Sequence, residues 1–195
     1  IDRAEAVIHS IETWRADLSR RTMSTAEKKC PQAYVGGIGF RKVQGIESTQ
    51  HHYPPLEWIH AENLAQRIAT RAGSHVVMAR EMLLKLDPPF IFIDGGGIEL
   101  VAADAAKKPE FYKALTAFAN HRFYVLHPFN WYTTNIDTAL TDAYAMGKIL
   151  YPDCFKDIDP EQKADEIYSE LVGRPVYEKM KADYGPIGRV VPFVD

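Results

Sequence analysis

Short apolar runs alternate with helical segments along this chain, and the plainest run is residues 90–93 (FIFI), which ends in Asp94 and three glycines. An apolar run of this length without polar alternation indicates a strand buried on both faces, as in a parallel sheet between helices. Strands that alternate with helices also imply right-handed crossover connections. The pattern therefore predicts an α/β fold with three α/β/α layers and a mainly parallel central sheet.

Hydrophobic spacing and turn residues locate the expected elements. Strands are predicted at residues 33–37, 75–78, 90–93 and 122–126, with a further edge strand at 188–193 and a polar loop at 41–53. Helices are predicted at residues 1–29, 54–68, 80–86, 109–120, 134–151, 160–172 and 175–180. The expected organisation is one main domain after a long first helix.

The composition argues against several classes of function. The 195 residues include 23 Lys+Arg and 26 Asp+Glu, a net charge of −3, without a dense basic stripe, so nucleic-acid binding is not expected. No apolar run approaches the roughly 20 residues of a membrane span. The first residues do not resemble a signal peptide, and the helical start without Met predicts a fragment. Cys30 and Cys154 lack metal-site spacing, and we do not expect them to pair.

A loop rich in aromatic and amide side chains follows the predicted strand at 122–126, within residues 127–152 (HPFNWYTTNIDTALTDAYAMGKILYP). Open α/β sheets bind ligands at the carboxyl ends of their strands, where this loop lies. The next helix is predicted to begin at Thr134, with Asp137 in the capping-box position. Two interpretations of the loop remain open: contact with a ligand or partner, or packing of its aromatic rings at the rim of the core. The residues concerned are Asn130, Trp131, Tyr132, Thr133 and Asn135.

Two glycine clusters do not complete a nucleotide-binding motif. The dinucleotide fingerprint from Gly37 and Gly39 needs a third glycine where this chain has Lys42, and residues 95–97 lack the lysine and hydroxyl residue of a P-loop. A nucleophile elbow, G-x-S-x-G, is also absent from the sequence. The residues therefore predict no catalytic centre.

Two adjacent histidines, His51 and His52, form a candidate pocket for a metal or chelate with Glu47, Tyr53 and Glu57. Imidazole is the commonest protein ligand for transition metals. Neighbouring side chains of an extended segment point in opposite directions, so at most one histidine would address a given site. Without H-E-x-x-H or a second ligand pair at fixed spacing, a solvated loop is the simpler interpretation.

Six segments follow one another in a recognisable order: 34–37 (YVGG), 48–55 (STQHHYPP), 61–65 (AENLA), 81–94 (EMLLKLDPPFIFID), 109–115 (PEFYKAL) and 130–152. Together they resemble the C-terminal half of the ABC-transporter substrate-binding proteins for iron complexes, siderophores, haem and cobalamin, the helical-backbone or class III family. The resemblance covers essentially the whole chain, and residues 130–152 are its most specific part.

In this family a long helix joins two α/β lobes, and the ligand lies in the cleft between them. The resemblance implies that residues 1–29 are part of that helix, that residues 30–195 are the C-terminal lobe, and that the N-terminal lobe is missing. It implies a solute-binding component rather than an enzyme, with no cofactor, that delivers an iron complex, siderophore, haem or corrinoid to a membrane permease. The protein would be a monomer, either periplasmic or extracellular as a membrane-anchored lipoprotein.

The resemblance also implies two sets of site residues. Acidic surface residues of the family dock onto permease arginines, and here Glu57 is the first choice and Glu47 the second. Stabilisation of a helix start by its dipole explains Glu57 equally well. The residues expected to face the ligand cleft, because each lies in a loop at a strand end, are His51, His52, Tyr53, Gly96, Asn130, Trp131 and Tyr132.

Two other functions remain as alternatives. One is a metal-dependent enzyme that uses His51 or His52, which loss of turnover on replacing either histidine would favour. The other is a sensing or signalling module that presents a ligand to a different partner with the same fold. A permease and an ATPase encoded beside the gene would argue against the second.

Overall fold

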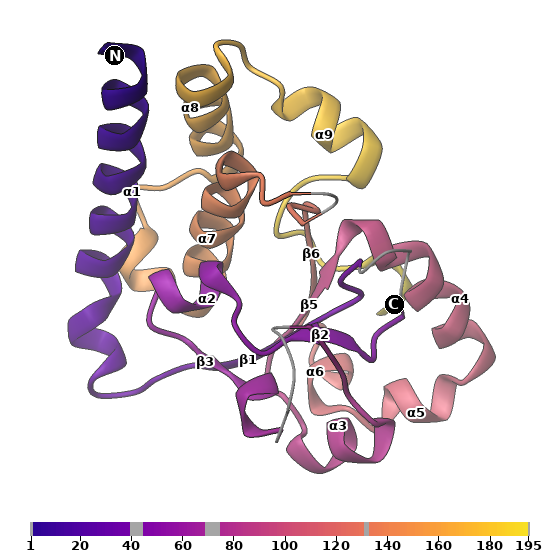
Figure 1. Ribbon diagram of the computed structural model, residues 1–195. Coiled ribbons are helices and arrows are strands. Elements are labelled where there is room, and N and C mark those ends of the chain that lie inside the picture. Colours follow the sequence, from indigo (N-terminus) through magenta and orange to yellow (C-terminus); the bar gives the residue numbers. More distant parts are fainter. Residues whose placement is uncertain (1, 40–44, 69–74, 131–132, 195) are drawn as a thin grey trace.

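A parallel sheet runs through the centre of the protein (Figure 1). The computed structural model describes residues 2–39, 45–68, 75–130 and 133–194. Within these residues the main sheet has the order β3-β1-β5-β6, and its neighbouring strands are parallel. Its strands are β1 (Gln32–Gly36), β3 (Glu62–Asn63), β5 (Ile91–Asp94) and β6 (Phe123–Leu126). This arrangement confirms the predicted α/β fold with a mainly parallel central sheet.

Strand β5 is covered on both faces, as its apolar sequence predicts. Side chains alternate across a strand, so Phe92 packs in one hydrophobic cluster while Ile91 and Ile93 pack in another. The register places Val35 of β1 beside Phe92, and Val125 of β6 beside Ile93. Two separate clusters on the two faces account for the three-layer architecture.

Helices cover both faces of the sheet. Side chains of α1, α2, α7 and α8 join the cluster of Phe92, whereas side chains of α3, α4, α5 and α6 join the cluster of Ile91 and Ile93, in agreement with their positions in Figure 1. The α-helices are α1 (Asp2–Ala26), α2 (Pro54–Trp58), α3 (Arg80–Leu86), α4 (Ile98–Lys107), α5 (Pro109–Lys113), α6 (Thr116–Ala119), α7 (Ile136–Leu150), α8 (Pro160–Val172) and α9 (Tyr177–Tyr184). Single 3₁₀ turns are η1 (Leu64–Arg67), η2 (Gly95–Gly97), η3 (Pro152–Phe155) and η4 (Pro192–Val194).

Two short strands lie outside the main sheet. β2 (Ser48–Gln50) and β4 (His75–Val77) pair antiparallel, with Ser48 opposite Val77. The strand predicted at 75–78 is therefore confirmed, but the prediction of a loop throughout 41–53 is wrong at β2. A three-residue strand is too short to show a period of two in the sequence.

The helix predicted at 54–68 ends at Trp58. His60 has a positive φ of 51°, a left-handed backbone that stops the helix. The chain then forms β3 and η1, where the Asn63 side chain accepts a hydrogen bond from the Ala65 N–H. Residues that were predicted to extend a helix thus add an edge strand to the sheet.

The segment between β5 and β6 contains more helices than predicted. The helix expected at 109–120 is divided into α5 and α6 because Leu115 is extended, with φ −85° and ψ 125°. Helix α4 precedes them and was not predicted, since the glycines before it are typical of a turn. Its buried residues Val101 and Ala105 nevertheless stand four apart, which is helical spacing.

Helix α7 begins at Ile136, and its N-cap is Asn135 rather than the predicted Thr134. The carbonyl oxygen of Asn135 accepts the Ala139 N–H at 3.0 Å, while no side chain caps the helix. The predicted capping box is therefore wrong, although the helix itself is confirmed.

Helix α8 is confirmed with both of its predicted ends. The Asp159 side chain accepts hydrogen bonds from the N–H groups of Glu161 and Gln162, and Gly173 ends the helix with φ 82°. Helix α9 covers Tyr177–Tyr184 instead of residues 175–180. At the predicted edge strand 188–193, the described residues form an isolated bridge between Tyr124 and Val190.

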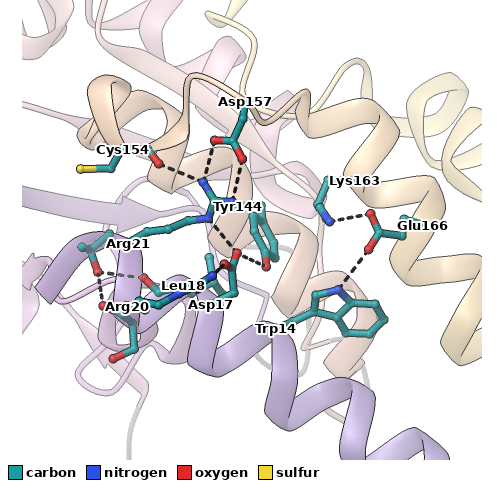
Figure 2. Close-up of polar contacts among 12 residues, drawn as sticks. Trp14, Asp17, Leu18, Arg20, Arg21, Tyr144, Cys154, Asp157, Lys163 and Glu166 are labelled. Carbon is teal, nitrogen blue, oxygen red and sulfur yellow. Dashed lines mark hydrogen bonds and ion pairs between the residues drawn. The ribbon is translucent and has the colours of Figure 1, made fainter.

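Helix α1 lies against α7, α8 and η3. A polar network forms around Asp17 in its C-terminal half (Figure 2). Asp17 Oδ2 accepts hydrogen bonds from Arg21 Nε at 2.7 Å and from the Tyr144 hydroxyl at 2.9 Å. Burial opposes ionisation of Asp17, but the bonds from Arg21, Arg20 and Tyr144 outweigh it and lower the pKa of this carboxyl. The ionised network fixes α1 to α7.

A second polar contact joins the middle of α1 to α8. The indole Nε1 of Trp14 donates to Glu166 Oε1 at 3.3 Å, and Lys163 holds the other oxygen of the same carboxylate at 2.5 Å (Figure 2). Trp14 and Leu18 are also buried in the cluster of Phe92. Nearer the start of α1, Arg3 and Ser10 bind Glu170 of α8. Helix α1 is thus attached to the body of the protein from both halves.

Candidate ligand-binding site

The carboxyl ends of β1, β5 and β6 meet at one edge because these strands are parallel. There, Asp94 Oδ1 accepts the Gly96 N–H at 2.8 Å and holds the turn η2. Gly37 follows β1 with a φ of 75°, and a Cβ at this position would lie within 3.6 Å of Gly97 Cα. That distance is an ordinary van der Waals contact, so the positive φ is what explains glycine at position 37. The edge is therefore formed by tightly packed turns.

A hollow of about 770 Å³ opens between this edge and helices α8 and α9. Its polar side is formed by the turn η2, by Pro128 after β6 and by the first turn of α7. Its apolar wall includes Leu100 and Val172, which are both 45% exposed. The other apolar wall residues include Ile98, Val176, Met180 and Tyr168. Of the residues predicted to face a ligand, Gly96 lines this hollow.

Three carboxylates lie at the hollow, and its described lining residues include no Lys, Arg or His. Asp137 Oδ1 accepts the backbone N–H of Thr138 at 2.6 Å at the start of α7. Asp183 forms an ion pair with Lys179 at 2.9 Å. Glu99, in the first turn of α4, is exposed. The net charge of the lining residues is therefore negative.

Asn130, in the loop after β6, contacts the last residue of β2. Its Nδ2 donates to Gln50 Oε1 at 3.1 Å. Asn63 supports the end of the same strand, because its Nδ2 donates to the carbonyl oxygens of Gln50 at 2.9 Å and of His51 at 3.3 Å. Asn130 and Asn63 therefore both bind Gln50, the residue that precedes the half-buried His51.

Tyr53 is a core residue, which corrects the prediction that it faces a ligand. It is 1% exposed, and its ring packs on Phe129 with a centroid distance of 5.3 Å. His52 is exposed, and its Nδ1 lies 3.3 Å from Glu57 Oε1. The predicted residues Trp131 and Tyr132 lie outside the described residues.

Sequence reasoning missed two buried carboxyl groups beneath the edge, on Asp94 and Asp142. Asp142 Oδ1 accepts the His127 N–H at 3.0 Å, while its Oδ2 has no hydrogen-bond partner among the described residues. Burial raises the pKa of Asp142 well above its ordinary value, and nearby Asp94 adds to the rise. Burial also raises the pKa of Asp94 to about 7. The sequence signal that could have identified them is an acidic residue within a strand or helix whose other residues are mostly apolar.

The two predicted docking residues differ in their surroundings. Glu47 Oε1 binds Arg80 Nε at 2.5 Å, and Arg80 also binds Asp104 at 2.6 Å. Glu57 stands in the first turn of α2 with its side chain 43% exposed. The carboxylate of Glu57 is therefore more accessible to a partner than that of Glu47.

Cys30 and Cys154 are both free thiols. Within the described residues, no group of three or more His, Cys, Asp or Glu is arranged to hold a metal ion. No helix in the described part of the chain combines the length and apolar character of a membrane span.

Neither a protein-family model nor a curated protein sequence matches this chain. Solved structures do match it. An ABC transporter solute-binding protein from Sulfurospirillum deleyianum aligns with a TM-score of 0.70 and 18% identity, over 94% of this chain and 56% of that chain. MolA, a molybdate periplasmic binding protein from Haemophilus influenzae, aligns with a TM-score of 0.65 and 14% identity, over 89% of this chain and 50% of that chain.

CeuE from Helicobacter pylori, solved with Ni(II) bound, aligns with a TM-score of 0.65 and 15% identity, over 87% of this chain and 53% of that chain. The chain thus spans about half the length of the solved structures it matches. Over that length it has the fold of the periplasmic solute-binding proteins of ABC transporters, as the sequence resemblance predicted.

Proposed function

We propose that this chain is the C-terminal lobe of the solute-binding component of an ABC importer. The lobe binds an iron complex, a siderophore, haem or a corrinoid in a cleft against a second α/β lobe, and the loaded protein delivers this ligand to a membrane permease. The observation that carries the proposal is the fold shared with ABC-transporter solute-binding proteins over about half of their length. The structures that match include proteins named for molybdate and haem and one with Ni(II), which favours a metal-containing ligand.

The hollow supports a binding role because it lies at the carboxyl edge of a parallel sheet, where α/β folds bind ligands. Its volume of about 770 Å³ falls within the roughly 300–1,000 Å³ typical of small-molecule sites. Asn130, which follows β6, binds the Gln50 side chain at 3.1 Å. A ligand between two lobes would contact this edge on one side only, which fits an open hollow.

Helix α1 supports the assignment of residues 1–29 to a linker between lobes. Asp17 and Arg21 hold its C-terminal half, and Arg3 and Ser10 bind Glu170 of α8. Ile8 on the same helix is nevertheless 55% exposed. A second lobe would cover this exposed isoleucine. Since a helix fixed to one lobe connects the two, we expect only modest hinging on ligand binding.

Glu57 is the proposed contact with permease arginines, with Glu47 as second choice. Glu57→Ala in the full-length protein is expected to reduce ligand uptake by cells and to leave the Kd for ligand unchanged. Glu47→Ala is the matched comparison, and a smaller effect is expected because Arg80 already neutralises Glu47. Such a protein works in the periplasm, or outside the cell as an anchored lipoprotein.

The direct test is titration of the full-length protein with ferric siderophores, haem and cobalamin, followed by tryptophan fluorescence. The chain has three tryptophans, and Trp131 is the one predicted to contact the ligand. A Trp131→Phe variant should lose most of the ligand-dependent change, while Trp58→Phe should keep it. Absence of binding by every ligand would contradict the proposed function.

Two alternative functions keep their own tests. A metal-dependent enzyme would lose turnover on His51→Ala or His52→Ala, whereas a binding protein would show no turnover to lose. A sensing module with the same fold would bind ligand equally well but would not restore uptake to cells that lack the transporter's own binding protein.

A further inference from the structure

We propose that the hollow between η2, α8 and α9 receives an apolar, uncharged or cationic face of the ligand and disfavours polyanionic chelates. This inference rests on the proposed solute-binding function and specifies the ligand class for the same edge of the sheet. It is carried by two independent features of the hollow, the composition of its wall and its charge.

The first feature is an apolar wall that protein atoms do not cover. Leu100 and Val172 stand on different helices, each with 45% of its surface exposed, and both line the hollow. Met180 and Tyr184 extend the same wall along α9. Exposed apolar surface in a concave site gains free energy when an apolar ligand removes it from water. The occupant therefore has an apolar body rather than only a compact ionic group.

The second feature is an excess of negative charge. Asp183 is compensated by Lys179 at 2.9 Å. Asp137 accepts the N–H of Thr138 and forms no ion pair with the Lys and Arg side chains of the described residues. Glu99 is exposed on the rim, and the described lining residues include no Lys, Arg or His. Both carboxylates stand in the first turn of a helix, whose positive N-terminus offsets part of their charge. The charge that remains on Asp137 and Glu99 repels an anion that enters the hollow.

The negative charge of the hollow decides which ligands it favours. Like charges repel one another, and the repulsion grows as they approach and as solvent is excluded from between them. A chelate with several negative charges meets this repulsion at both Glu99 and Asp137, whereas a neutral or cationic chelate does not. The apolar wall is equally available to all of them, so net charge separates the ligand classes.

The test uses full-length protein and a charge series built on one scaffold. The probes are a linear ferric trihydroxamate with a free terminal ammonium group, its uncharged N-acetyl derivative and its anionic N-succinyl derivative. A corrinoid without net charge and haem with its two propionates complete the panel. We expect the ammonium or N-acetyl form to bind tighter than the N-succinyl form, and haem not to be the tightest ligand of the panel.

The variant Glu99→Gln removes one rim charge without changing the size of the side chain. It is expected to raise the Kd of the ammonium probe about three- to tenfold and to lower that of the N-succinyl probe. If the hydroxamates do not bind, the same variant is expected to lower the Kd of haem. Glu110→Gln is the matched control, because Glu110 is an exposed carboxylate on α5, far from α9 in Figure 1, and it should change neither value.

The outcomes separate this inference from the proposed function. If no probe binds, the solute-binding function itself fails. If the N-succinyl form or haem binds tightest, or if Glu99→Gln has no effect, a ligand binds but the charge preference is wrong. A Leu100→Ser variant of the full-length protein tests the apolar wall, and it should raise the Kd of the probes that bind. If it lowers the Tm and leaves every Kd unchanged, protein rather than ligand covers the hollow, and the inference is overturned.

Discussion

Arg21 near the end of α1 binds both carboxylate oxygens of Asp157, which follows η3, with hydrogen bonds of 2.7 and 2.8 Å (Figure 2). The same guanidinium group donates to Asp17 on its own helix and to the carbonyl oxygen of Cys154. Asp157 is exposed, so solvent screens its attraction and the pair with Arg21 contributes little by itself. The larger contribution comes from Asp17, whose partly buried carboxylate depends on Arg21.

Replacement of Arg21 by alanine should weaken the attachment of α1. We expect the Arg21→Ala variant to lose about 1–2 kcal/mol of unfolding free energy, because Asp17 keeps its charge but loses its main donor. Urea denaturation followed by circular dichroism measures the loss. Arg174→Ala, at an exposed position, is the control and should stay within about 0.5 kcal/mol of the wild type. Equal stabilities of the two variants would contradict the role given to Arg21.

The central strands could be predicted because their signal is local. Residues 90–93 are apolar without interruption, and β5 is buried on both faces. Helix α8 could be predicted at both ends since Asp159 and Gly173 are specific capping residues. At these positions the local preference of the chain and the tertiary structure agree.

The remaining errors come from interactions between distant residues. β2 depends on pairing with β4, and Tyr53 depends on packing against Phe129. Neither partner can be identified from the local sequence. The same limit applies to the hollow, because its wall combines α4 with α8 and α9. Gly96 and Asn135, whose places in loops after strands are local properties, were the parts of the wall that could be predicted.

The only glycine within α7, Gly147, leaves room for the ring of Phe155. A Cβ at position 147 would lie 2.4 Å from Phe155 Cζ. We expect Gly147→Ala to destabilise the protein, because overpacking costs about 1–3 kcal/mol and outweighs a helix-propensity gain of at most about 1 kcal/mol. Denaturant unfolding of Gly147→Ala, Phe155→Leu and the double variant forms the test. The double variant should lose less unfolding free energy than the two single variants lose together, because the smaller leucine side chain at position 155 makes room for the new methyl group. Losses that simply add would contradict the clash.

Asn63 fixes the loop that carries His51. Its side chain is 2% exposed, donates to the carbonyl oxygens of Gln50 and His51, and accepts the Ala65 N–H. In Asn63→Asp the acceptor remains but both donated bonds are lost, so we expect a loss of about 2–3 kcal/mol in unfolding free energy. Faster amide hydrogen exchange around residues 50–53 should accompany it. Gln66→Glu, at an exposed neighbouring position, is the control and should change neither measurement. A similar loss of unfolding free energy in both variants would show that the added negative charge, rather than the lost hydrogen bonds, destabilises the protein.

The buried carboxyl of Asp94 should make stability fall as pH rises from about 4 to about 7. Its pKa rises from 3.8 to about 7 on folding because burial disfavours the charged form. In that range the folded state binds the proton that the unfolded state releases, so the stabilisation is complete below the unfolded pKa and is lost as pH passes the folded one. Burial raises the pKa of Asp142 as well, so this group also makes stability fall as pH rises. Burial lowers the pKa of His127, so this group makes stability rise with pH.

Asp94→Asn isolates the contribution of this one carboxyl, since the amide oxygen still accepts the Gly96 N–H. Unfolding free energy measured at several pH values between 4 and 7 should decline less steeply in the variant than in the wild type. The difference across the range should be on the order of 1–4 kcal/mol. Because Asp142 and His127 remain in both proteins, their effects largely cancel in the comparison. Parallel pH profiles would show that Asp94 titrates normally in the folded protein.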